Sequence, residues 1–285
     1  MKMRIKKENF PILEFDHNKN ALIRPNHIFK PIEIPKRCVL CNFGEAIEKV
    51  LGEYPHRLIT YFEAEAIKIP IYELDYKGEK IALAMAYVGA PGAAVQIEVL
   101  TALGCRKYIA CGGCGVLQKE IAVGHLMIPI AAVRDEGTSY HYIKPAREIA
   151  ANEHVVGVIE NTLSQQEVPY IQAKTWTTDA FYRETPARIQ QRIREGCVTV
   201  DMEVSAYMAV AQYNKVELGQ ILYAGDNLAG DKWDRRDWDS KPRFEKACCG
   251  LRLMHVCPCN TMLLLYSERI GESADIMLTN LKGEG

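Results

Sequence analysis

The sequence lacks any long apolar run and any excess of charge of one sign. No segment reaches the roughly 18 consecutive apolar residues that a membrane-spanning helix needs, and the N-terminal stretch "MKMRIKKENF" is charged, with no apolar core or cleavage site behind it. We therefore expect a cytoplasmic protein without membrane contact. The 35 basic and 36 acidic residues give a formal net charge of −1, so the chain has no general attraction to nucleic acid. A small molecule is the expected partner.

Internal repeats and low-complexity linkers are also missing. With 48% apolar residues in 285, the chain can bury a substantial core, and we expect one domain over residues 1–285. Residues 1–36 show little periodicity and are expected to form an N-terminal arm. Residues 240–285 are expected to form a C-terminal helical region.

The ten cysteines do not indicate a disulfide framework, because such frameworks usually belong to short chains with little core. We expect free thiols. Metal binding is not expected either, because the two CxxC spacings lack a second pair or suitably spaced histidines. The remaining group is interpreted as ordinary buried thiols, with metal binding as the alternative, and consists of Cys248, Cys249, His255, Cys257 and Cys259.

Short, nearly continuous apolar runs alternate with helical patterns. Such runs are typical of strands covered on both faces, and the helices are marked by a proline near the start and a glycine at the end. The alternation predicts an α/β protein with a mixed, largely parallel sheet between helices. The expected strands cover residues 37–43, 80–89, 107–113, 126–135, 170–178, 197–202 and 219–226, and the expected helices lie at 91–104, within 145–166 and at 186–196.

The unusual residues of the chain follow these strands. The stretches are "VGAPG", "CGGCG", "RDEGTSYHY", "TTDAFY", "DMEVSA" and "GDNLAG". Ligands of open α/β sheets bind beyond the carboxyl ends of strands, so these stretches together predict a pocket. In "CGGCG", closely spaced backbone N–H groups at Gly112 and Gly113 could form an anion-binding nest, although an ordinary glycine turn is the alternative.

Three acids stand at these strand ends. Asp201 and Glu203 could cap a helix, or a carboxylate there could accept hydrogen bonds from two neighbouring hydroxyls, as on a ribose, with Met202 against the sugar. Asp226 could be a turn residue, or it could remain protonated in a desolvated pocket and donate to a leaving group. The residues alone leave both alternatives open.

Taken in order, these motifs resemble the nucleoside phosphorylase family, which includes uridine phosphorylase, the hexameric purine nucleoside phosphorylases and the methylthioadenosine nucleosidases. The resemblance covers roughly residues 25–240. It implies a three-layer α/β/α sandwich and cleavage of the N-glycosidic bond of a nucleoside, by phosphate or by water, with no metal or organic cofactor. It also implies a homo-oligomer, a dimer or a hexamer, with sites near subunit contacts.

The resemblance assigns roles residue by residue. Glu203, with Met202 and the accompanying Asp201, matches the ribose site, to which His27 would add a contact from a neighbouring subunit. Asp226 matches the acid that protonates a purine leaving group, although Gly225 precedes it where the family usually has Ser. The other matches are Phe181 and Thr177 for the base, and Gly89, Gly112 and Gly113 for the phosphate or water site.

The chain departs from the phosphorylases at the phosphate ligands. The first loop, "CNFGEAIEK", contains no arginine, and Ala110 and Gly113 stand where the family has Arg and Ser or Thr. Arg57 or Arg134 could supply the charge, although a structural role is the alternative for each. Phosphorolysis is expected ahead of hydrolysis, and a member that binds nucleoside without cleaving it is the third possibility. The base, purine or pyrimidine, stays open.

Overall fold

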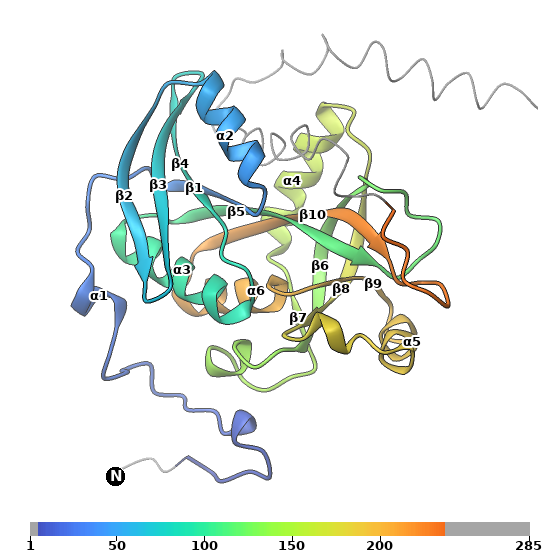
Figure 1. Ribbon diagram of the computed structural model, residues 1–285. Helices are drawn as coiled ribbons and strands as arrows, with labels where there is room; N and C mark the ends of the chain where they lie inside the picture. Colours follow the sequence, from blue (N-terminus) through green and yellow to red (C-terminus); the bar gives the residue numbers. More distant parts are fainter. Residues whose placement is uncertain (1–4, 237–285) are drawn as a thin grey trace, which may run out of the picture.

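The computed structural model describes residues 5–236 (Figure 1). The expected C-terminal helical region at 240–285 and its cysteines lie outside the described residues. All seven predicted strands are present, as are the three predicted helices. The strands are β1 (Arg37–Cys41), β2 (His56–Ala64), β3 (Ile67–Tyr76), β4 (Glu79–Met85), β5 (Lys107–Val116), β6 (Leu126–Asp135), β7 (Glu148–Ala150), β8 (Tyr170–Thr178), β9 (Cys197–Asp201) and β10 (Glu217–Asn227).

Helices of four to fourteen residues connect these strands. The α-helices are α1 (Pro25–Ile28), α2 (Gly44–Glu53), α3 (Ala90–Leu103), α4 (Glu153–Gln165), α5 (Pro186–Arg194) and α6 (Val204–Asn214), and the short 3₁₀ helices are η1 (Pro11–Leu13), η2 (Ser139–His141) and η3 (Phe181–Arg183).

The strands form one mixed sheet in the order β10-β6-β8-β9-β5-β1-β4-β3-β2, with β7 added beside β6. Strands β4, β1, β5 and β10 run parallel to one another, as do β6, β8 and β9. Because β10 pairs with both β5 and β6, one part of the sheet closes into a ring. The two parallel sets meet in that ring as antiparallel neighbours, β5 with β9 and β10 with β6.

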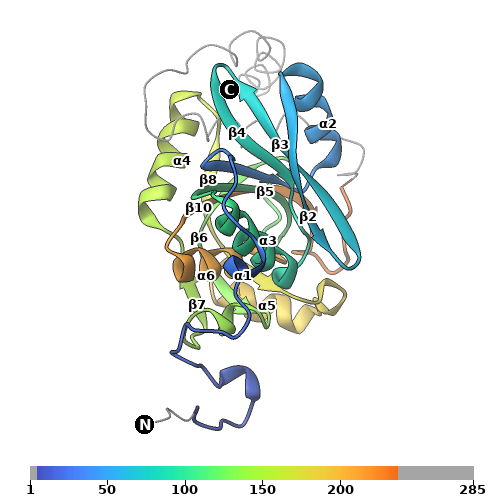
Figure 2. The ribbon, with the colours of Figure 1, turned by 90° about the vertical axis from the view of Figure 1, so that its left-hand side faces the viewer.

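Two apolar cores cover the two faces of the sheet. One core contains α2 and α4 residues such as Ile47 and Ile159, and the other contains α3 and α6 residues such as Ile97 and Val210. Figures 1 and 2 show α2 and α4 on one side of the sheet and α3 and α6 on the other. The expected three-layer α/β/α arrangement with a mixed sheet is confirmed.

The elements that were not predicted include α2 and the hairpin strands β2 and β3. Most side chains of β2 are exposed, and β3 alternates between buried and exposed positions, so neither presents a continuous apolar run. The turn between β3 and β4 has positive φ at both Lys77 and Gly78, which matches the twist that a tight hairpin requires. The described part of the chain contains no helix both long and apolar enough to cross a lipid bilayer.

The six cysteines within residues 5–236 are buried free thiols, as expected.

Of residues 5–36, only η1 and α1 are helical. The segment is attached to the body through the Ile32 N–H, which donates to Leu103 O at 3.0 Å, and through Lys19, whose Nζ lies 4.5 Å from the ring centre of Tyr213.

Candidate functional site

The predicted strand ends converge where β5 meets β9 and β10. Gly115 of β5 pairs with Val200 near the end of β9, and the next residue, Val116, pairs with Asn227 at the end of β10. A Cβ atom on Gly115 would lie 2.5 Å from Leu228 Cδ1 and 3.4 Å from Asp226 Oδ1. Only glycine therefore permits this close approach, which brings Asp226 against β5.

Glu203 lies at the start of α6 and contacts the start of α3. Its Oε1 accepts a 2.6 Å hydrogen bond from the Gly89 N–H, where Gly89 is the residue before α3 and has φ of 88°. Burial raises the pKa of Glu203 to about 7, although the Gly89 N–H opposes that rise. The site thus holds a carboxyl group that changes charge near neutral pH.

Asp201 is a helix-capping residue rather than a free acceptor. It is 6% exposed, and its Oδ1 accepts from the backbone N–H groups of Glu203 and Val204 at 2.9 and 2.7 Å. Its Oδ2 accepts from Thr175 Oγ1 at 2.5 Å. Burial raises its pKa to about 6 against these hydrogen bonds. The oxygens of Asp201, which was expected at the ribose, are engaged within the chain in this structure.

Thr177 forms a hydrogen bond with Asp201 and so holds its carboxyl group in place. Its side chain is fully buried, its hydroxyl donates to Asp201 at 3.1 Å, and the same oxygen accepts from the Ser205 N–H at 3.0 Å. The Thr177 side chain, expected at the base, is thus engaged with Asp201 and Ser205 in this structure.

Glu184 is an acid of the site that the sequence analysis did not single out. It follows η3 directly, three residues after Phe181 in the same motif. Burial raises its pKa to about 7, and the charges of Asp226 and Asp201 add to that rise. The presence of another acid in "DAFYRET" was the available signal. The site therefore gathers four carboxyl groups from three separate strand ends.

The glycine stretch does not form an anion-binding nest. Gly112 and Gly113 lie within β5 and pair in parallel with Leu222 and Tyr223 of β10. A Cβ on Gly112 would come within 2.9 Å of Asn42 Oδ1, so this glycine lets Asn42 approach the strand. The Gly89 N–H, also expected at a phosphate or water site, instead donates to Glu203. Gly112 and Gly113 are therefore strand residues, and Gly89 contacts Glu203.

Neither candidate arginine is available as a phosphate ligand within this chain. Arg134 is 3% exposed, and its guanidinium donates to Ser139 Oγ and Lys144 O, each at 2.8 Å. Arg57 forms a bidentate pair with Glu73 at 2.9 and 2.8 Å. Both guanidinium groups therefore have partners within the chain, as the structural alternative expects.

Phe181 and Met202 border the site. Phe181 belongs to η3, is 48% exposed, and has its ring centre 4.0 Å from that of Tyr182. Met202 is half-buried between Asp201 and Glu203. About half of the Phe181 side chain is therefore exposed to solvent.

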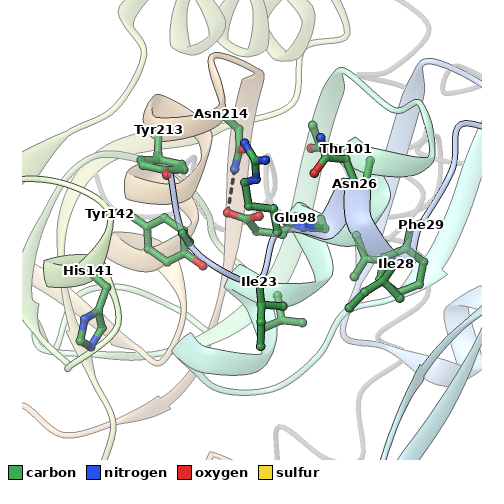
Figure 3. A pocket seen from close by; sticks show the side chains of 16 residues that line it. Ile23, Asn26, Ile28, Phe29, Glu98, Thr101, His141, Tyr142, Tyr213 and Asn214 are labelled. Carbon is green, nitrogen blue, oxygen red and sulfur yellow. Dashed lines mark hydrogen bonds between the residues drawn. The ribbon is translucent and has the colours of Figure 1, made fainter. Parts of the chain in front are cut away.

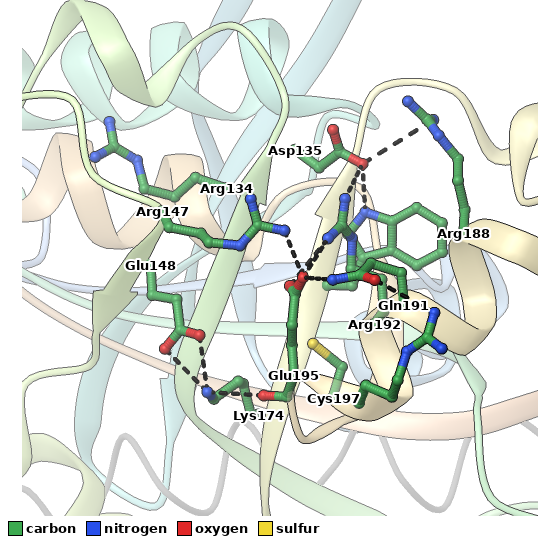
Figure 4. A network of polar contacts seen from close by, with 12 residues as sticks. Arg134, Asp135, Arg147, Glu148, Lys174, Arg188, Gln191, Arg192, Glu195 and Cys197 are labelled. Atoms are coloured by element: carbon green, nitrogen blue, oxygen red, sulfur yellow. Dashed lines mark hydrogen bonds and ion pairs between the residues drawn. The ribbon is translucent and has the colours of Figure 1, made fainter.

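A polar network fixes α5, which follows Phe181 and Glu184 in the chain (Figure 4). Asp135 Oδ2 accepts from Trp176 Nε1 at 2.9 Å and from Arg192 at 3.3 Å. Arg192 also donates to both oxygens of Glu195, at 3.0 and 2.9 Å. The network ties the helix to β6 and β8, so the segment carrying Phe181 is held at both ends.

His27 is remote from these carboxyl groups along the chain. It lies on α1, is exposed, and accepts from Arg24 Nε at 3.2 Å. Next to α1, a cavity of about 580 Å³ opens between the N-terminal segment, α3 and the end of α6. Figure 3 shows Glu98 in this cavity, accepting from Asn214 at 3.3 Å. None of the predicted site residues lines it.

Within residues 5–236, no group of three or more His, Cys, Asp or Glu side chains is arranged to hold a metal ion. Acids dominate the site, and Arg236, which lies beside it, donates to the backbone oxygens of Ile121 and Asp226. The site can therefore accept hydrogen bonds from hydroxyl groups, exchange protons near pH 7 and stabilise positive charge.

The fold and this site define an α/β protein with acids clustered at converging strand ends. The chain belongs to the phosphorylase superfamily, whose family model matches residues 36–250. It is 27% identical over 187 residues to guanosine phosphorylase from Halorubrum lacusprofundi, covering 62% of this chain and 76% of that one. It is 36% identical over 153 residues to uridine phosphorylase from Thermococcus kodakarensis, covering 54% of each.

Solved structures share the fold. Uridine phosphorylase from Vibrio fischeri superimposes with a TM-score of 0.66 at 23% identity, covering 82% of this chain and 94% of that one. AMP nucleosidase from Bacteroides thetaiotaomicron has a TM-score of 0.63 at 21% identity, with 79% and 89% covered. At this identity the likeness concerns the fold, which phosphorylases and a nucleosidase have in common.

Proposed function

We propose that the protein cleaves the N-glycosidic bond of a nucleoside. The observation that carries this proposal is Glu203, a carboxylate held by the Gly89 N–H at the junction of α3 and α6, with Asp226 and Glu184 among the neighbouring acids. Ionised, Glu203 accepts hydrogen bonds from two adjacent hydroxyl groups. The ribose 2′- and 3′-hydroxyls are such a pair.

The acid cluster provides the electrostatics of the reaction. As the bond between C1′ and the base breaks, positive charge develops on the sugar, as in glycoside hydrolysis. Negative charge on Glu203 stabilises that transition state more than the ground state. Asp226 donates a proton to a purine base as it leaves, and the exposed ring of Phe181 packs against the base.

Phosphate is the first candidate nucleophile, giving free base and ribose 1-phosphate. The names of the curated relatives, guanosine and uridine phosphorylase among them, support it. Water is the second candidate. Arg134 and Arg57 each pair with other groups of this chain, and Ala110 stands where the family has arginine. These features favour water, because phosphate usually needs charge-assisted contacts.

The site is proposed to be completed in a homo-oligomer. His27 is exposed on α1 and makes its hydrogen bond within the N-terminal segment, so it is free to face a second copy. A partner could supply His27 to the ribose and a cation to the phosphate. Size-exclusion chromatography with light scattering measures the assembly; a strict monomer with full activity would contradict this part of the proposal.

Base release tests the proposed function directly. Purine and pyrimidine nucleosides are incubated with the protein, each with and without inorganic phosphate, and the base and sugar products are separated by chromatography. Phosphate-dependent formation of ribose 1-phosphate establishes a phosphorylase, whereas free ribose formed without phosphate establishes a hydrolase. Tight nucleoside binding with no base released would identify a non-catalytic binding protein.

Glu203→Ala tests the ribose assignment. We expect kcat/KM to fall by about 100-fold or more, because two hydrogen bonds to a charged acceptor contribute about 1.5–3 kcal/mol each. Circular dichroism and thermal unfolding verify that the variant folds. Wild-type turnover by a folded Glu203→Ala protein would exclude the assignment.

A further inference from the structure

The chain after β10 turns back and brings an indole onto Asp226. Asn227 and Asp234 pair through two backbone hydrogen bonds of 2.8 and 3.0 Å, closing a loop between them. Trp233 lies beside this closure, and its Nε1–H donates to Asp226 Oδ2 at 2.6 Å. Arg236 anchors the far side by donating to Ile121 O and Asp226 O.

The two carboxyl oxygens of Asp226 have different neighbours. Oδ2 accepts from Trp233, whereas Oδ1 faces Gly115, 3.4 Å from where that residue would carry a Cβ. A carboxyl group held at one oxygen has a fixed orientation, so its other oxygen is presented in one direction. Oδ1 therefore faces the meeting point of the strand ends.

The indole is not held there by burial. Trp233 is 64% exposed. An indole N–H usually forms a hydrogen bond where its ring is buried, but here the hydrogen bond is made by an exposed ring. The hydrogen bond and the paired loop, rather than core packing, keep Trp233 at Asp226. Its free ring face lies open beside the acid.

We propose that Trp233 is a positioning residue that acts through Asp226. The inference rests on the proposed function, in which Asp226 gives its proton to the departing base. In that step the bond from C1′ to the base nitrogen breaks, its electron pair goes to the base, and the proton moves from Asp226 Oδ1 to the base. The nucleophile bonds to C1′, either as a phosphate anion or as water that releases one proton to the solvent. Asp226 becomes a carboxylate, and its new charge is stabilised by the Trp233 N–H at Oδ2.

This arrangement predicts which kinetic constant changes. A hydrogen bond to a carboxylate is stronger than one to a neutral carboxyl group. The bond therefore strengthens as the proton leaves, which lowers the barrier without tightening substrate binding. Removing the N–H should lower kcat and leave KM almost unchanged.

Trp233→Phe removes the N–H and keeps an aromatic ring. On guanosine, we expect kcat to fall about 10- to 100-fold, the range for one hydrogen bond to a charged group. On 7-methylguanosine, whose base leaves without accepting a proton, we expect a change of less than about threefold. Lys232→Ala, an exposed neighbour in the same loop, is the control and should match wild type on both substrates.

A double-mutant cycle with Asp226→Ala shows whether the effect passes through the acid. If Trp233 acts through Asp226, Trp233→Phe causes no further loss in the Asp226→Ala background. Equal losses on both substrates, or a full additional loss in that background, would overturn the inference. Wild-type cleavage with an unaffected Trp233→Phe enzyme overturns the inference alone, whereas no cleavage of any nucleoside by wild type overturns the proposed function with it.

Discussion

Asp201 and Glu203 lie two positions apart, yet the fold gives their carboxyl groups different surroundings. Asp201 ends β9 and accepts hydrogen bonds from two backbone N–H groups and two threonine hydroxyls. Glu203 accepts from Gly89, a residue distant in the chain. Asp201 therefore fixes the start of α6, and α6 in turn places Glu203 where a ligand can reach it.

Thr177→Val tests this supporting role. Valine has nearly the same shape but cannot donate to Asp201 or accept from the Ser205 N–H, so buried polar groups lose a partner. We expect the free energy of unfolding to fall by about 1–3 kcal/mol, measured by urea denaturation. The ratio of kcat/KM between purine and pyrimidine nucleosides should stay constant; a changed ratio would return Thr177 to the base site.

The residue types of the site could be predicted from the sequence, but the direction of each side chain could not. Thr175 and Thr177 point to the same side of β8 because side chains alternate along a strand. Which side faces the ligand depends on the parallel pairing with β9, which a single sequence does not reveal. Glu184 was missed for a related reason, since only the fold brings it near Asp226.

At the scale of the elements, α5 is fastened by charged groups. Glu195 accepts from Arg147, Gln191 and Arg192, and Arg192 also reaches Asp135 at the end of β6. Burial opposes ionisation of Glu195, but these donors outweigh it and lower its pKa to about 2. Because α5 follows η3, the network restrains the segment that carries Phe181.

Glu195→Gln should therefore destabilise the protein in a pH-dependent way. The folded pKa of about 2 lies below the ordinary value of 4.5, so the contribution of Glu195 is present above about pH 4.5 and is lost as the pH falls toward 2. We expect a loss of about 2–3 kcal/mol at pH 7, measured by urea denaturation.

The same comparison at lower pH provides the check. The difference between wild type and Glu195→Gln should shrink at pH 3.5. Lys6→Ala, which removes an exposed ion pair with Glu8, is a control that should change stability little at either pH. A Glu195→Gln difference that stays constant with pH would exclude the network as its origin.

The elements themselves were predictable where burial is complete. Strands such as β6 and β8, covered on both sides, were located to the residue, whereas the mostly exposed β2 left no apolar run to detect. The glycines of β5 were interpreted as an anion-binding nest, with an ordinary glycine turn as the alternative. Their real reason is close approach by Asn42 and Leu228, a tertiary contact without a local signature.

At the scale of the whole molecule, closing the ring of strands produces the site. The antiparallel contact of β5 with β9 brings the ends of the two parallel sets together. Asp201 of β9, Asp226 of β10 and Glu184, which follows η3, therefore lie near one another, and the charges of Asp226 and Asp201 raise the cost of ionising Glu184. Activity and stability should consequently depend on pH in opposite directions.

In the proposed function the ionised form of Glu203 binds the ribose hydroxyls, and burial raises the pKa of Glu203 to about 7. We therefore expect kcat/KM to increase up to about pH 7, with an apparent pKa shared among Glu203, Glu184 and Asp201. The free energy of unfolding should fall over the same interval, from about pH 4.5 to 7. The reason is that groups with a raised folded pKa hold protons that the unfolded chain has already released.

Glu203→Gln should lose activity at every pH and weaken this decline, as urea denaturation at pH 5 and 7.5 measures. If activity and stability of the wild type rose together across this range, the buried acids would not be the groups that bind the sugar.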